Sequence, residues 1–158
     1  MKLSKSKSTD GKGLISHYKG LDKAKKHITI GIQPDAQDYA DGTSILTVAV
    51  AGEYGNARLR IKPRYFLSRS VSKDHAFYQA RIRKLLKAYR KGAATFLNVG
   101  LSELGRQGVA KVRENIETNS IGMAGNSPNT IQAKGGDQPM VDSGHLVRQI
   151  DFRLEGGK

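Results

Sequence analysis

The chain has 158 residues, which suits a single domain with a core of its own. It contains no cysteine, which excludes disulfides and thiolate chemistry and fits a reducing cytosol. No apolar run approaches the ~20 residues needed to cross a bilayer, so no membrane partner is expected. Aromatic residues make up 6% of the chain and Trp is absent, which predicts a small, largely aliphatic core.

Charge is spread unevenly along the chain, whose net charge is +13. Residues 58–91 hold twelve basic residues and one acid, a net charge of +11. Residues 34–57 hold four acids and no base, and residues 92–158 are neutral. The basic surface is therefore local, and it invites an anionic partner, either nucleic acid or an acidic protein.

The N-terminal part begins with a Lys, Ser and Gly-rich stretch, residues 1–13, which we expect to be a disordered basic arm. Residues 14–25 place four apolar side chains at helical spacing and predict one or two helical turns. Residues 27–32 alternate isoleucine with other residues, which predicts a strand that ends at Pro34. A single domain is expected over residues 14–155, with a frayed tail at 156–158.

Residues 34–43 are acidic and predict a loop, but residues 44–54 are ambiguous. Their β-branched content allows a buried strand, whereas Ser44 as N-cap and the spacing of Ile45, Val48 and Gly52 favour a helix. Periodicity alone leaves both open. Residues 57–62 alternate weakly and predict a short strand or hairpin arm.

Two long helices are predicted next, over residues 72–90 and 94–117. Gly92 separates them. The second helix contains three glycines, each of which costs about 1 kcal/mol relative to alanine. Close approach of another backbone is the expected compensation. The first helix has a basic side, composed of Arg81, Arg83, Lys84, Lys87, Arg90 and Lys91.

Residues 119–139 are rich in Gly, Asn, Ser and Pro and predict a long flexible loop. Asp142 or Ser143 should then cap a short helix that ends near Gln149. Residues 150–154 alternate apolar and charged side chains, which predicts a final strand beside the first one. The expected fold is α+β, a small antiparallel sheet packed against two long helices.

Catalytic and metal-binding patterns are weak throughout. The four histidines are scattered, and the acidic residues of the 34–43 loop lack the order of a calcium loop. Lys134 and the glycines after it have the wrong order for a phosphate-binding loop. Asp142, Ser143 and His145 are consecutive, and a catalytic triad needs convergence from different segments. We expect no enzyme activity, catalytic residue, metal or cofactor.

The basic helix face has two interpretations. A solvated face that keeps the protein soluble is favoured by about two to one over a functional anion-binding face. As a functional surface, it would contact phosphates with an affinity that falls steeply with salt. The aromatic residues of this helix, Tyr78 and Tyr89, lie on its apolar side, which favours a place in the core over a role in stacking on nucleic-acid bases.

One signature runs from Glu53 to Leu67, and a second runs from Pro128 to Leu146. Taken in this order, the two signatures resemble the tail-completion and head–tail joining (neck) proteins of long-tailed bacteriophages, including tail-terminator-like proteins. The resemblance spans about residues 26–155 and favours a helix for residues 44–54. Pro63-Arg64 inverts the usual Arg-Pro order, and Ser143 stands where the family has Thr. The residues that carry the resemblance are Glu53, Tyr54, Gly55, Pro63, Arg64, Tyr65, Phe66, Leu67, Pro128, Thr130, Lys134, Pro139, Met140, Val141, Asp142, Ser143, Gly144 and Leu146.

The resemblance implies a non-enzymatic structural protein of the virion, assembled in the host cytoplasm. It would form a ring, a hexamer or dodecamer by family analogy, at the head–tail neck or the top of the tail tube. Its partners would be copies of itself, the tail tube protein, a head-side connector or stopper protein, and possibly DNA in the channel. The 119–139 loop would contact a neighbouring subunit or line that channel. A basic nucleic-acid-binding protein is the alternative, and a small hydrolase is a weaker one.

Overall fold

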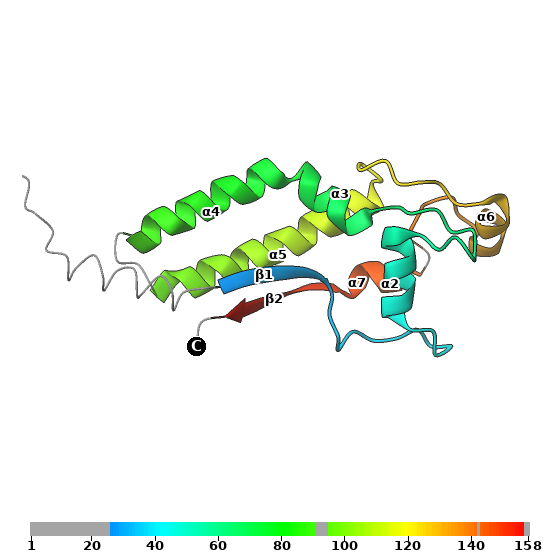
Figure 1. The fold of residues 1–158 in the computed structure, drawn as a ribbon, viewed down its shortest axis with the longest axis horizontal. Coiled ribbons are helices and arrows are strands. Elements are labelled where there is room, and N and C mark those ends of the chain that lie inside the picture. Colours follow the sequence, from blue (N-terminus) through cyan, green and yellow to red (C-terminus); the bar gives the residue numbers. More distant parts are fainter. Residues whose placement is uncertain (1–25, 91–94, 142, 157–158) are drawn as a thin grey trace, which may run out of the picture.

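The computed structural model describes residues 26–90, 95–141 and 143–156. It confirms an α+β fold, in which a small antiparallel sheet lies along one side of the long helices (Figure 1). The predicted arm at residues 1–13 and the predicted helix at 14–25 lie outside the described residues. In chain order the elements are β1 (Lys26–Ile32), α2 (Ile45–Tyr54), α3 (Phe66–Lys73), α4 (His75–Arg90), α5 (Thr95–Glu117), α6 (Pro128–Lys134), α7 (His145–Arg148) and β2 (Ile150–Gly156).

The sheet joins two strands from distant parts of the chain. β1 and β2 pair antiparallel, with Lys26 opposite Gly156 and Ile32 opposite Ile150. This confirms the predicted pairing of the first and last strands. Gly156 belongs to β2, so the prediction that the frayed tail starts there was wrong, because the backbone of Gly156 pairs with Lys26. Residues 157–158 lie outside the described part.

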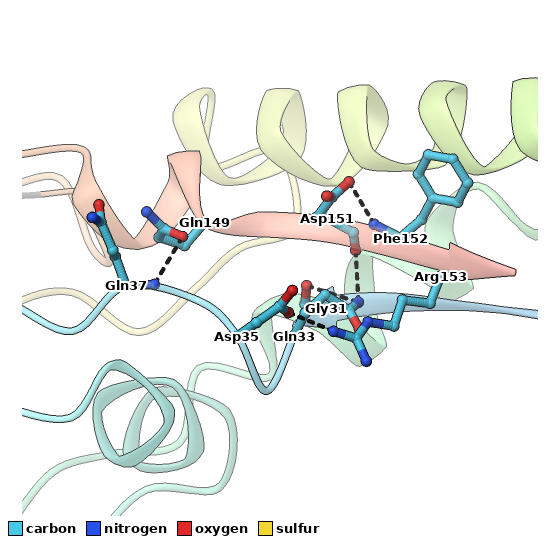
Figure 2. Close-up of polar contacts among 8 residues, drawn as sticks. All are labelled: Gly31, Gln33, Asp35, Gln37, Gln149, Asp151, Phe152 and Arg153. Carbon is cyan, nitrogen blue, oxygen red and sulfur yellow. Dashed lines mark hydrogen bonds and ion pairs between the residues drawn. The ribbon is translucent and has the colours of Figure 1, made fainter.

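Polar contacts fix the point where the chain leaves β1 and enters β2 (Figure 2). The buried Gln33 side chain donates from Nε2 to the carbonyl of Asp151 at 3.2 Å. Arg153 and Asp35 form an ion pair at 2.5 Å. The side-chain oxygen of Gln149 accepts a hydrogen bond from the amide of Gln37 at 3.2 Å. These contacts hold the acidic loop after β1 beside the start of β2.

Helix α5 is the centre of the fold. Both strands pack along it, and α4 packs against it as well (Figure 1). The sheet therefore rests mainly on α5 rather than equally on both long helices. The core continues from α5 onto α2, α3 and the start of β2, through the fully buried side chains of Val112, Ile116, Ile45, Phe66 and Ile150.

The glycines of α5 are places where side chains from neighbouring elements approach. A Cβ on Gly105 would collide with the ring of Phe152, and one on Gly108 with Cδ1 of Ile30. Gly100 faces Leu85 in the same way. Within the chain, side chains rather than another backbone therefore approach these glycines, and an approach across a subunit boundary stays a prediction. Packing of side chains from β1, β2 and α4 into the glycine positions offsets their weak helix propensity.

The helix predicted at residues 72–90 is two helices. α3 already begins at Phe66, and the chain turns at Asp74 before α4 starts at His75. The earlier start follows from a cap that Glu53 supplies from a distant segment. The predicted C-cap of the preceding helix is confirmed, because Gly55 closes α2 with a φ of 77°. Asn56 and Ile61 then form an isolated antiparallel bridge, as a hairpin arm would.

The segment 119–139 is more ordered than a structureless loop. Residues 128–134 form α6, whose N-cap Ser127 accepts a hydrogen bond from the amide of Thr130. Pro128 occupies the first turn, where its missing amide costs nothing. The prediction of a continuous flexible loop was therefore wrong at α6, because Ser127 and Pro128 together start a helix.

Candidate assembly surfaces

The first signature folds into one compact unit around the buried carboxylate of Glu53. Its oxygens accept hydrogen bonds from the amides of Leu67 and Ser68 at 2.9 and 3.2 Å. The Ser68 hydroxyl donates a third bond at 2.5 Å. Glu53 at the end of α2 therefore caps the first turn of α3. Phe66, the first residue of that turn, is fully buried.

The backbone between Gly55 and Phe66 makes this cap possible. Gly55 has a positive φ, and a Cβ there would lie 2.8 Å from the carbonyl of Ile61 and from the nitrogen of Pro63. Tyr65 has a left-handed backbone with a φ of 51°, and its amide donates to the Glu53 carbonyl at 3.1 Å. Gly55 and Tyr65 thus allow the chain to reverse direction sharply between α2 and α3.

Arg64 connects the first signature to the segment 119–139. Its Nε donates to the carbonyl of Ala124 at 3.2 Å, and its Nη2 donates to Oδ1 of Asn126 at 2.9 Å. Asn126 in turn donates to the carbonyls of Asp137 and Gln138. Burial lowers the pKa of the Arg64 guanidinium from its ordinary value. Arg64 therefore holds the chain just before α6, and Asn126 connects that point to the chain just after α6.

The second signature packs beside the first. Pro139 is buried, and the side chain of Met140 lies where a Cβ on Gly52 of α2 would be. Gly144, with a φ of 73°, is the N-cap of α7, while Ser143 accepts from the amide of His145 at 3.3 Å. The helix start was predicted one or two residues too early. Asp142, the other predicted cap, lies outside the described residues.

The remaining signature residues are not all brought together. Pro128 and Thr130 lie in the first turn of α6, and the backbone of Lys134 ends that helix. Arg64 faces a cleft of about 780 Å³ whose walls also include Pro128 and Thr130, together with Lys62 and Met140. Tyr54 points away from this region, with 72% of its surface exposed.

The outer face of α2 is apolar and exposed. Leu46, Val50 and Tyr54, spaced four residues apart, are 43%, 57% and 72% exposed. We call them the α2 stripe. The opposite face, with Ile45 and Ala49, lies in the core. The one charged residue of α2 is the buried Glu53, so the helix presents no charge to solvent. Sequence reasoning missed this surface because it left strand and helix open here, and it placed only Ile45, Val48 and Gly52 at helical spacing.

The basic side of α4 is exposed to solvent at Arg81, Arg83, Lys84 and Lys87. Arg81 lies over the ring of Phe77, with 5.4 Å between its Cζ and the ring centroid. Arg83 donates to Oε1 of Gln79, one helical turn earlier, at 3.4 Å. Arg90 ends α4, and Lys91 lies outside the described residues. The four described cations are available to an anionic partner.

A second apolar surface lies beside these cations. It is a groove of about 490 Å³ between β1, α4 and α5, which we call the α4 groove. Ile82 and Leu86 of α4 are 43% and 48% exposed there. Leucine and isoleucine so exposed on one wall make the groove adhesive to another apolar surface. Among the residues that line it are Ile28, Val71, Tyr78, Ile82, Leu86 and Leu101.

Comparison with protein families, curated proteins and solved structures gave no match. Within the described residues, no three His, Cys, Asp or Glu side chains gather as metal ligands. In the same part of the chain no helix is both long and apolar enough to span a membrane. The exposed surfaces that stand out are therefore the α2 stripe, the α4 groove and the basic side of α4.

Proposed function

We propose that the chain is a structural virion protein of a long-tailed bacteriophage. Copies of it form a ring at the head–tail neck or at the top of the tail tube. The ring joins the tail tube protein to a head-side connector or stopper protein by contact alone, without catalysis. DNA passes through its channel. The order of the signatures along the chain supports the family, and the contact of Met140 with Gly52, which packs the second signature beside the first, is consistent with it.

The observation that carries an assembly role is the apolar outer face of α2. A helix that is apolar all round is normally buried on all sides. Apart from the exposed Thr47 and the buried Glu53, α2 is apolar, yet the α2 stripe is exposed in the isolated chain. Exposed apolar patches of this kind mark contact surfaces for other proteins. A neighbouring subunit that covers the α2 stripe in the assembled ring would bury this exposed apolar face.

Purified particles of the phage that encodes the chain test the proposal. Mass spectrometry should detect the chain in intact virions, and labelled chains should locate to the neck by electron microscopy. A Val50→Lys variant, supplied in place of the wild-type chain, should give heads and tails that do not join. Val99→Lys is the matched control, since Val99 of α5 is 63% exposed and lies outside both apolar surfaces. Virions that lack the chain would overturn the proposal.

The exposed cations of α4 support a second candidate, a basic nucleic-acid-binding protein. Arg81, Arg83, Lys84 and Lys87 would contact phosphates, so affinity for duplex DNA would fall steeply as salt rises. A Lys84→Gln and Lys87→Gln double variant should then lower both the affinity and its salt dependence. Strong DNA binding by chains that never assemble would favour this candidate over the ring.

A further inference from the structure

The two apolar surfaces of the molecule lie toward opposite ends. α2 lies near α6 at one end, whereas the start of β1 and the end of α4 lie toward the other (Figure 1). The α2 stripe is convex, a row of three side chains on a helix, and the α4 groove is concave. A contact between two different surfaces of identical chains is heterologous, and repetition of it gives a closed ring when the rotation closes.

Charge favours the same pairing. The loop that leads into α2 carries Asp38 and Asp41, both exposed, and Asp38 Oδ1 accepts from the first amide of α2 at 2.9 Å. The α4 groove is bordered by the cations of α4. Helical spacing places Arg83 and Lys87 next to Leu86 around the helix. An acidic edge beside the α2 stripe therefore matches a basic edge beside the α4 groove.

We propose that the α2 stripe of one copy docks in the α4 groove of the next copy. The acidic loop of the first copy then lies against the basic side of α4 in the second. This inference rests on the proposed function for the ring, and it names the two surfaces that build it. It also assigns the cations of α4 to a neighbouring protein rather than to DNA.

Cross-linking tests the pairing directly, because the natural chain contains no cysteine. A full-length Val50→Cys chain is mixed with an Ile82→Cys chain and treated with a short bismaleimide linker. The two chains should cross-link several-fold more than Val50→Cys with Val99→Cys. The concentration is the highest at which the protein stays soluble, so that a weak contact is also captured. A product no stronger than the control, or a preference of Val50→Cys for itself, would overturn the pairing.

Complementation of two variants gives an independent readout. Val50→Lys keeps an intact α4 groove, and Leu86→Lys keeps an intact α2 stripe. Each variant alone should remain monomeric, and their mixture should give complexes of two chains and no larger ones, measured by native mass spectrometry. Assembly of Leu86→Lys alone as in the wild type would show that the groove is not the partner surface. Both positions are exposed, so neither substitution should prevent folding.

The two proposals fail in different ways. A wild-type chain that forms rings in virions, without the cross-link between Val50→Cys and Ile82→Cys, would overturn this pairing and leave the proposed function standing. A cross-link that forms in solution, with no chain present in virions, would support the pairing and overturn the phage function.

Discussion

The carboxylate of Glu53 accepts a 2.9 Å hydrogen bond from the amide of Leu67, 14 residues further along the chain. The end of α2 thus supplies the cap for the first turn of α3. A buried carboxylate at the end of one helix fixes the direction of the next, and the apolar packing of Phe66 follows from it.

Loss of this cap should destabilise the protein. In a Glu53→Ala variant the amides of Leu67 and Ser68 lose their acceptor, which costs about 1–3 kcal/mol for buried polar groups. Urea unfolding should show a lower midpoint with a similar slope. Glu103→Ala is the control, because Glu103 is an exposed partner of Arg106 and should change the free energy of unfolding little. Equal stability of the two variants would contradict the capping role.

Gly105→Ala should also destabilise, despite the better helix propensity of alanine. The new Cβ would collide with the ring of Phe152, and overpacking costs about 1–3 kcal/mol against a propensity gain of about 1 kcal/mol. Substitution of Phe152 by Leu in the Gly105→Ala chain should recover part of the loss. Gly125→Ala, which has open space around it, should be neutral. Urea unfolding of wild type, Gly105→Ala, Phe152→Leu and the double variant measures the coupling between the two positions. Additive changes in the free energy of unfolding would contradict the predicted collision.

Arg64→Lys should loosen the segment 119–139 without unfolding the protein. A lysine cannot replace the separate donors that reach Ala124 and Asn126. Loss of these bonds should speed amide hydrogen exchange across residues 124–138 by about tenfold, which corresponds to about 1.4 kcal/mol. Arg58→Lys, at an exposed position, is the matched control. Unchanged exchange in the Arg64 variant would show that other contacts hold the segment.

Acid should selectively weaken the junction between α3 and α4. Burial raises the pKa of the Asp74 carboxyl, but hydrogen bonds from Asn115 and Lys111 and the nearby charges outweigh this, so the pKa lies below 3.8. A lowered folded-state pKa contributes stability above the unfolded value, and this stability is lost as pH falls through the folded value. Asp74→Asn should therefore be less stable than wild type at neutral pH.

The stability difference should begin to shrink as the pH falls below about 4, where the carboxyl of the unfolded chain becomes protonated, and should go on shrinking until the pH passes below the lower folded-state pKa. Unfolding by urea at a series of pH values measures it. Asp137→Asn serves as the control, because Asp137 is exposed and its substitution should give no such pH dependence. A constant gap between wild type and Asp74→Asn down to strongly acidic pH would contradict the role of the ionised carboxylate.

Local patterns predicted the elements that have a regular spacing of apolar residues. The alternation of Ile28, Ile30 and Ile32 gave β1, and the 3.6-residue spacing of apolar residues gave α5. The start of α3 was missed because its cap comes from Glu53 on another helix, which no window of adjacent residues contains. The start of α6 could have been found from Ser127 and Pro128, a local cap that the glycines and asparagines around it concealed.

The candidate surfaces were only partly predictable for a similar reason. Helical spacing revealed the basic side of α4 directly. Exposure of Leu46, Val50 and Tyr54 depends on which face of α2 the rest of the chain covers, and composition cannot show that. The signature residues were expected to fix the fold and position the interfaces. The structure gives Glu53, Gly55 and Arg64 internal supporting contacts, and their effect on assembly stays a prediction.

The pairing of β1 with β2 sets the order in which the molecule can mature. Lys26 pairs with Gly156, so the sheet cannot close until residue 156 has been synthesised and has left the ribosome. Incomplete translation products lack β2 and the packing of Phe152 on α5. A chain terminated before β2 therefore lacks the second strand of the sheet and cannot acquire the native fold.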